Sequence, residues 1–225
     1  MDYAAIQRAT AALYKATADK DHAAMREAIA AGAVVNAPHD PHRYSRTLVE
    51  QAAMNGDAEA LRILIAAGAD TRAARSGGEG PLYYAVHYGH VEAARVLLKA
   101  GAYGGPIRLG VGVLSMLHIA KTPEIVEALL ESKGFDVNYA PKVGGQTALM
   151  LAADRGDIRS MELLIQAGAE TWRTDANGNT ARQRAVLCRR HEAAAWLENL
   201  ELRDALEWKT RPAAEAKGSS RSKSL

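Results

Sequence analysis

A chain of 225 residues with 48% hydrophobic residues can bury a continuous core, which excludes a wholly disordered protein. The aromatic share is only 5%, so the core must be built mainly from Ala, Leu, Ile and Val. A net charge of +2, from 28 basic and 26 acidic residues, provides no long-range field for nucleic acid, and we do not expect binding to bulk DNA or RNA.

Cysteine usage and the N-terminal sequence bear on where the chain resides. Cys188 is the single cysteine, so it has no intramolecular disulfide partner and belongs to no multi-cysteine zinc site, as is typical of a reducing compartment. The N-terminal residues include the acidic Asp2 and lack the apolar run of a secretory signal. No stretch approaches the roughly 18 apolar residues of a membrane helix. We therefore expect a cytoplasmic protein without a membrane partner.

Along the chain, glycines recur at intervals of 33 to 36 residues, at Gly32, Gly68, Gly101, Gly134 and Gly168. Each follows a leucine-rich or otherwise aliphatic stretch of helical character, at residues 25–30, 61–66, 96–99, 125–130 and 161–166. A helix that is followed by a sharp reversal needs a residue at positive φ, which Gly adopts without a Cβ clash. Each of these helices is therefore predicted to end at its glycine.

A second marker, about twelve residues before four of these glycines, divides each unit into two short helices. It consists of the pairs Lys20-Asp21, Gly56-Asp57, Gly89-His90 and Gly156-Asp157. Asp57 and Asp157 are predicted to cap the second helix of their units by accepting hydrogen bonds from its free N–H groups. Because neither helix of such a unit can bury its apolar stripe alone, the units are expected to stack.

Residues 80–102, which begin Gly80-Pro81-Leu82, resemble an ankyrin repeat, and residues 146–169 resemble one too. The resemblance extends over roughly residues 4–198 and implies an all-α ankyrin-repeat solenoid of about six helix-turn-helix units with short loop or hairpin connections. The repeat domain is predicted to span residues 1–208, followed by a flexible basic tail at residues 209–225. The first helices are expected to begin near Leu13, Val49, Leu82, Leu117, Leu149 and Arg182.

Several units depart from the family pattern. The first has Lys20 where the family prefers Gly, as expected of an N-terminal cap, and the unit at Leu117 must have a shortened first helix. The sixth has Arg189 and Arg190 at its turn, and its closing helix is expected to run through Leu200, Leu202, Leu206 and Trp208. The apolar loop 104–114 either repairs the core beside the shortened unit or forms a contact surface. Core repair predicts that charging Leu109 or Val111 lowers the thermal stability.

The sequence offers few candidates for chemistry. Cys188 and His191 could form a nucleophile and base pair, but no third orienting group is evident. His39 and His42 are an incomplete metal site in a Pro-containing loop. His118, Asn36 and Asn138 match positions at which the family uses the side chain structurally. We therefore predict no enzyme activity, no cofactor, no metal and no small-molecule substrate.

In the ankyrin family, a concave face is formed by loop tips and the exposed side of each first helix. The resemblance implies that a partner protein would bind there. Its N-terminal half is rich in Tyr, Arg, Met and His, which are frequent at binding hot spots. The candidate partner-binding residues are Arg43, Tyr44, Arg46, Met54, Asn55, Glu79, His87, Tyr88, Lys142, Asp154 and Arg155.

The predicted function is that of a non-catalytic adaptor or regulator that binds a protein through this face. Arg outnumbers Lys about two to one, which suggests a GC-rich bacterial source. Small bacterial proteins that resemble this family include immunity proteins, which neutralise a cognate secreted toxin, and effectors, which are translocated and bind a host protein. Nucleic-acid binding through Arg43, Arg46 and the basic tail is a weaker alternative. A mixed-charge face with exposed Tyr would favour a protein partner.

Overall fold

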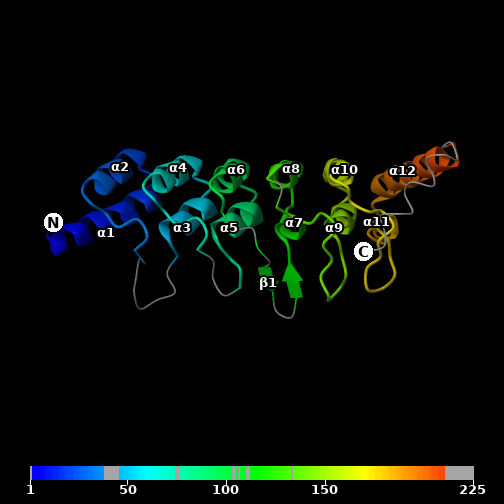
Figure 1. Cartoon of the computed structure of the whole chain (residues 1–225), viewed down its shortest axis with the longest axis horizontal. Helices are drawn as coiled ribbons and strands as arrows, with labels where there is room; N and C mark the ends of the chain where they lie inside the picture. The colour runs from blue at the N-terminus through cyan, green and yellow to red at the C-terminus, as the bar shows by residue number, and fades with distance from the viewer. Residues whose placement is uncertain are drawn as a thin grey trace, which may run out of the picture.

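The computed structural model shows two rows of helices that run side by side along the molecule (Figure 1). The residues that it describes are 2–37, 46–73, 77–102, 105, 107–109, 112–132 and 134–210. Within them, each unit contributes one helix to each row, and the loops project from the row of first helices (Figure 1). The predicted all-α solenoid of six helix-turn-helix units is confirmed.

The first helices form the inner row, which lies between the outer helices and the loops. They are α1 (Tyr3–Asp19), α3 (Leu48–Met54), α5 (Pro81–Tyr88), α7 (Met116–Ile119), α9 (Ala148–Arg155) and α11 (Ala181–Leu187). The second helices form the outer row. They are α2 (His22–Ala30), α4 (Ala58–Ala66), α6 (Val91–Lys99), α8 (Pro123–Glu131), α10 (Ile158–Gln166) and α12 (His191–Thr210).

Three helices, α1, α7 and α12, differ in length from the other helices of their rows. Helix α1 begins at Tyr3, ten residues before the expected start at Leu13, so the first inner helix is much longer than predicted. Helix α7 has only four residues, and the predicted shortening of this unit is confirmed. The closing helix α12 runs through Trp208 as expected and ends at Thr210. The tail from residue 211 onward lies outside the described residues.

The core is a ladder of equivalent positions on the outer helices. The fourth residue of each helix and the residue three later turn toward the inner row, because helical residues at this spacing share a face. The fourth residues are Met25, Leu61, Ala94, Val126, Met161 and Ala194, and all are buried. The residues three later are Ala28, Leu64, Leu97, Leu129, Leu164 and Leu197, and they too are buried. Small and aliphatic side chains thus pack between successive units.

The helix ends largely follow the sequence signals. Asp57 Oδ1 accepts from the Ala60 amide at 2.9 Å and Asp157 Oδ1 from the Ser160 amide at 3.0 Å, so both predicted caps are confirmed. Gly32, Gly68, Gly101 and Gly168 have positive φ and follow the outer helices as predicted. The prediction for Gly134 was wrong, because Gly134 lies three residues after the end of α8 instead of two and lacks a positive φ.

Polar side chains connect neighbouring units in the manner expected. Asn36 donates to the Gly68 carbonyl at 3.0 Å and accepts from the Asp70 amide at 2.8 Å. Asn138 makes the equivalent pair of bonds to Gly168 and Glu170, both at 2.9 Å. Each of these amides thereby satisfies two backbone groups of the next unit, which would otherwise lack protein partners.

The apolar loop between the third and fourth units contains a two-stranded hairpin. Strand β1 (Ile107–Leu109) pairs antiparallel with β2 (Gly112–Leu114). Ile107 is fully buried in the core, and the Arg108 amide donates to the Gly77 carbonyl at 2.7 Å. The burial of Ile107 favours the core-repair interpretation. The side chain of Leu109 and all of Val111 lie outside the described residues.

His118 is a buried link between the fourth and fifth units. Its Nε2 donates to the Gln146 carbonyl at 2.9 Å, and its Nδ1 accepts from the Ser115 hydroxyl at 2.9 Å. Burial lowers the pKa of His118, although the bond to Gln146 opposes the shift. The folded protein therefore holds the neutral imidazole, and the expected structural role is confirmed.

We expect His118→Gln to lower the free energy of unfolding by about 1–2 kcal/mol at pH 7.5, because two buried hydrogen bonds are lost. A lowered folded pKa means that the unfolded state binds more protons, so this stabilisation is fully present above pH 6.5 and is lost as the pH falls through the folded pKa. Urea titrations of both proteins at pH 7.5 and pH 5 should show the difference shrinking at the lower pH. A constant difference would contradict the assignment.

Candidate functional site

Five aromatic rings form a continuous strip on the third unit. The aromatic strip consists of Tyr83, Tyr84, His87 and Tyr88 on α5 together with His90 just after it. Neighbouring ring centroids lie 5.3 Å apart for Tyr84 and Tyr83, 5.4 Å for Tyr83 and His87, 5.1 Å for His87 and Tyr88, and 6.2 Å for Tyr88 and His90. These separations are typical of interacting aromatic pairs.

Local sequence explains how the strip is held. Pro81 begins α5 at a position where its missing N–H costs nothing, and Gly89 ends the helix with a φ of 77°. His90 Nε2 lies 2.9 Å from the Met54 carbonyl, which anchors this ring to the second unit. Gly56 is required there, because a Cβ on it would lie 2.6 Å from His90 Nδ1.

The solvent exposure of the rings differs along the strip, and charged side chains of both signs lie beside it. Tyr84 is buried, whereas Tyr88 is 52% exposed. The guanidinium of Arg46 lies 5.7 Å from the centre of the Tyr84 ring, within the range of a cation–π contact. Burial raises the pKa of Tyr83, and the Glu79 carboxylate raises it further. Arg46 and Glu79 therefore flank the rings with opposite charges.

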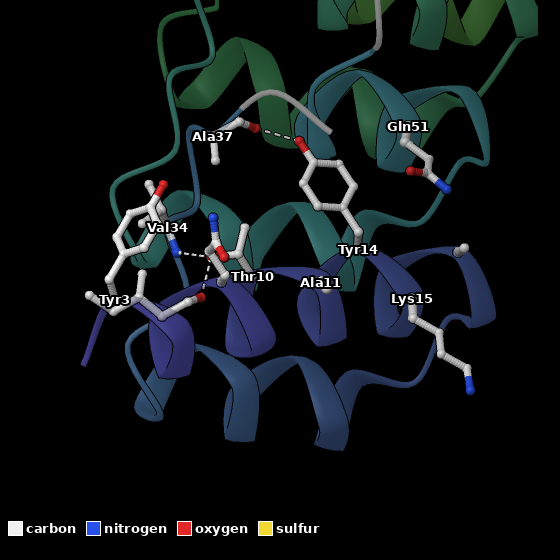
Figure 2. A pocket seen from close by; sticks show the side chains of 11 residues that line it. Tyr3, Thr10, Ala11, Tyr14, Lys15, Val34, Ala37 and Gln51 are labelled. Atoms are coloured by element: carbon white, nitrogen blue, oxygen red, sulfur yellow. Dashed lines mark hydrogen bonds between the residues drawn. The ribbon is translucent and has the colours of Figure 1, made fainter. Parts of the chain in front are cut away.

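A second feature of the inner face is a groove along α1, which sequence analysis did not identify (Figure 2). Its volume is about 590 Å³. Thr10 and Tyr14 direct their polar atoms to the backbone: Thr10 accepts from the Val34 amide at 3.0 Å, and Tyr14 donates to the Ala37 carbonyl. Burial and then Glu50 raise the pKa of Tyr14 to about 12, so it stays protonated. The walls are therefore mostly apolar, and Lys15 is the one charged side chain among the described residues that line the groove.

The predicted residues of the N-terminal half lie close to the aromatic strip where the structure describes them. Arg46 contacts the strip and His87 and Tyr88 belong to it. Met54 is half-buried, and the exposed Asn55 accepts from the Lys20 ammonium through its carbonyl at 3.1 Å. Arg43 and Tyr44 lie outside the described residues, as do His39 and His42.

The predicted residues of the C-terminal half are not part of this cluster. Lys142 is exposed, whereas Asp154 is bound within the chain. Arg184 donates to Asp154 through Nε at 2.9 Å and Nη2 at 2.5 Å, and to Asp175 through Nη1 at 2.8 Å. These three side chains, here called the Arg184 network, join the inner helices of the last two units. Arg155 lies beside them and is half-buried.

Two signals in the sequence could have revealed the missed features. Tyr83 and His87 are four residues apart, as are Tyr84 and Tyr88, so a helix from Pro81 places each pair on one face. The groove follows a stripe at helical spacing on α1. Its α1 residues are Tyr3, Ile6, Gln7, Thr10, Ala11, Tyr14, Lys15 and Ala18.

Comparison with protein families places most of the chain in repeats. A family model described as ankyrin repeats (3 copies) matches residues 11–105 and 114–203. Among the described residues, no helix is long and apolar enough to cross a bilayer, and no group of three or more His, Cys, Asp or Glu side chains is placed to hold a metal ion.

Curated proteins that resemble the chain are much longer and diverse. Dynein axonemal heavy chain 12 from Bos taurus is 27% identical over 56% of this chain and 37% of that protein. Diacylglycerol kinase zeta from Rattus norvegicus is 35% identical over 38% of this chain and 10% of that protein. Ankyrin repeat and SAM domain-containing protein 6 from Danio rerio is 28% identical over 68% and 20%. The chain spans well under half the length of each.

One solved structure resembles nearly the whole stack. It contains a predatory endopeptidase from Bdellovibrio bacteriovorus in complex with an immunity protein. The matched chain is 25% identical to this one with a TM-score of 0.70, over 84% of this chain and 97% of that chain.

Proposed function

This chain belongs to the ankyrin repeat family, and from that premise we propose that it is a non-catalytic module that binds a partner protein through its inner face, centred on the aromatic strip. The inner face is the exposed surface of the first helices and the loops that project from them. The strip is the observation that carries the proposal, because Tyr88 is exposed, the rings beside it are partly exposed, and the ring contacts order these side chains before a partner binds.

The chemistry of the strip favours a protein partner over nucleic acid. Arg46 and Glu79 flank the rings with opposite charges, whereas a nucleic-acid site would need a continuous basic surface. Exposed Tyr and His rings offer both apolar area and hydrogen-bonding tips, which suits protein interfaces. The strip and the α1 groove, which lie on either side of α3, would together provide room for a standard interface of about 800 Å² on this side.

The residues considered for catalysis are poorly suited to it. Partial burial and the neighbouring Asp154 raise the pKa of Cys188, whose Sγ lies 3.6 Å from Asp154 Oδ1. A thiol with a raised pKa is a weak nucleophile at neutral pH. The Asp154 carboxylate is itself engaged by Arg184. The surroundings of Cys188 therefore favour a function in binding over one in catalysis.

Tyr88→Ala is expected to weaken partner binding about 30-fold, the effect of losing one hot-spot contact of about 2 kcal/mol. His87→Ala should also weaken partner binding, because His87 orders Tyr88 through their ring contact. The measurement is capture of partners on the immobilised chain, followed by affinity titration of the captured protein against each variant.

The matched control is Trp172→Ala, which removes a ring that is 68% exposed in the loop after α10. It should leave the affinity unchanged, and circular dichroism should show all variants folded. Equal binding by wild type and the Tyr88 and His87 variants would reject the strip as the centre of the site.

A second candidate function is inhibition of a peptidase, and the structural similarity to a chain of the endopeptidase–immunity protein complex supports it. If the captured partner hydrolyses peptides, adding this chain at equal concentration should abolish that activity, and Tyr88→Ala should require a higher concentration. A captured partner whose activity is unaffected at saturation would leave the adaptor function in place and exclude inhibition.

A further inference from the structure

A basic pocket of about 400 Å³ lies at the turn between α11 and α12, against the end of α9. Three arginines, Arg155, Arg189 and Arg190, line it together with His191. Glu192 is the one acidic residue of its lining. The pocket is remote in the chain from the aromatic strip and plays no part in the proposed function.

Contacts with the backbone of the preceding unit hold Arg190 in place. Arg190 Nε donates to the Asp154 carbonyl at 3.0 Å, and its side chain packs over Gly156, where a Cβ would lie 3.1 Å from Arg190 Cδ. Arg189 has a φ of 57°, a conformation that the equivalent residues Gly56, Gly89 and Gly156 adopt more easily. Within the described part of the chain, the guanidiniums of Arg155 and Arg189 have no ion pair.

Arg155 carries a buried polar atom without a partner. Its Nε is inaccessible to solvent and forms no hydrogen bond with any described residue. Burial lowers the pKa of Arg155, although Asp157 and Asp154 act in the opposite direction. Both of those carboxylates are already engaged, Asp157 by the Ser160 amide and Asp154 by Arg184. The charge of the partly buried Arg155 is therefore only partly compensated by the chain, and an anion in the pocket would stabilise it.

The first turn of α12 lines the same pocket and brings the positive end of its helix dipole to it. Ala193 is 1% exposed and stands where Ala60 and Ser160 stand in their units, and those two amides donate to Asp57 and Asp157. The corresponding cap position is Arg190, which has no acceptor, so the Ala193 amide has no partner among the described residues. Helices α6 and α8 also lack a side-chain cap, but they do not open into a pocket of arginines.

We propose that this pocket binds a phosphate group, either free phosphate or the phosphate of a phosphorylated side chain. Guanidinium groups bind phosphate oxygens through short charge-assisted bonds, and the first amides of a helix point at an anion placed before it. The guanidinium groups of Arg155, Arg189 and Arg190 supply the positive charge, and the first turn of α12 adds the positive end of its helix dipole.

The test is a titration of the full chain with inorganic phosphate at constant ionic strength, followed by amide NMR shifts of Glu192 and Ala193. We expect saturable shifts with a millimolar dissociation constant. Arg155→Ala and Arg189→Ala should each weaken binding on the order of tenfold, as loss of a charge-assisted bond implies. Arg8→Ala removes an exposed arginine from α1 and should bind as the wild type does.

Two further titrations identify which compound supplies the phosphate group and test whether the pocket prefers phosphate to a carboxylate. Tighter binding of a phosphoserine amide than of inorganic phosphate would assign the group to a phosphorylated side chain, and the reverse order would assign it to free phosphate. Acetate that binds as tightly as phosphate would overturn the phosphate assignment. Shifts that do not saturate, or that persist unchanged in the folded Arg155→Ala Arg189→Ala variant, would overturn the site.

Discussion

Arg184→Ala is expected to lower the free energy of unfolding by about 3 kcal/mol, because it removes the shared cation of two partly buried carboxylates. The Asp175 side chain is 1% exposed and the Asp154 side chain 18%. With Arg184 gone, both charges would stay in a poorly solvated site without a counterion. Urea unfolding of wild type and variant at pH 7 measures the effect directly.

The structure explains why Asp175 stays ionised in this network. Burial alone would raise the pKa of Asp175, but bonds from the Asn179 amide, the Arg184 guanidinium and the Asn177 amide lower it overall. The two backbone bonds are both 2.9 Å long. Asp175 therefore holds its own loop closed while it pairs with Arg184, so the same carboxylate stabilises the loop and the junction between units.

The sign of the pH dependence follows from that lowered pKa. The unfolded state binds the proton first, so the stabilisation by Asp175 is fully present above pH 3.8 and is lost as the pH falls through the folded pKa. Arg159→Ala is the matched control, because Arg159 is 59% exposed and, among the described residues, its one ion pair is with Glu162. It should cost less than about 1 kcal/mol. Equal losses for the two variants would contradict a special role for Arg184.

The periodicity of the sequence predicted most of the fold because the same packing problem recurs in each unit. Leu64, Leu97, Leu129 and Leu164 fill equivalent core positions, so their spacing reports the stacking directly. Capping by Asp57 and Asp157 was also predictable, since it depends on a residue and an amide three positions later. Local rules of this kind need no knowledge of the neighbouring unit.

The features that were missed depend on contacts between units or lie outside the repeat pattern. Helix α1 begins at Tyr3, ten residues before the start that the repeat alignment gives, and that alignment hid these ten residues together with the groove. Gly134 fits the period in sequence, but the helix before it ends one residue earlier than that period requires. The pairing of Asp154 with Arg184 was not predicted, because it joins residues 30 positions apart in two different units.

The hairpin next to the shortest helix carries the second large expected effect. Helix α7 offers only four residues to the inner row, and Ile107 of β1 is fully buried in the core beside that unit. Two hydrogen bonds to backbone carbonyls hold the hairpin in place. The Arg108 amide donates to the Gly77 carbonyl, and the Tyr139 hydroxyl donates to the Val113 carbonyl at 3.2 Å. The hairpin therefore supplies apolar volume that a full-length helix would otherwise provide.

Ile107→Ala is expected to lower the free energy of unfolding by about 3 kcal/mol, as for other large-to-small changes in a packed core, and the melting temperature by roughly 6–12 °C. Arg108→Ala is the control on the same strand, because its side chain is exposed and its amide bond to Gly77 survives the substitution. It should change the melting temperature little. If Ile107→Ala melted like Arg108→Ala, the hairpin would not be part of the core, and its apolar residues would have to be explained as a contact surface.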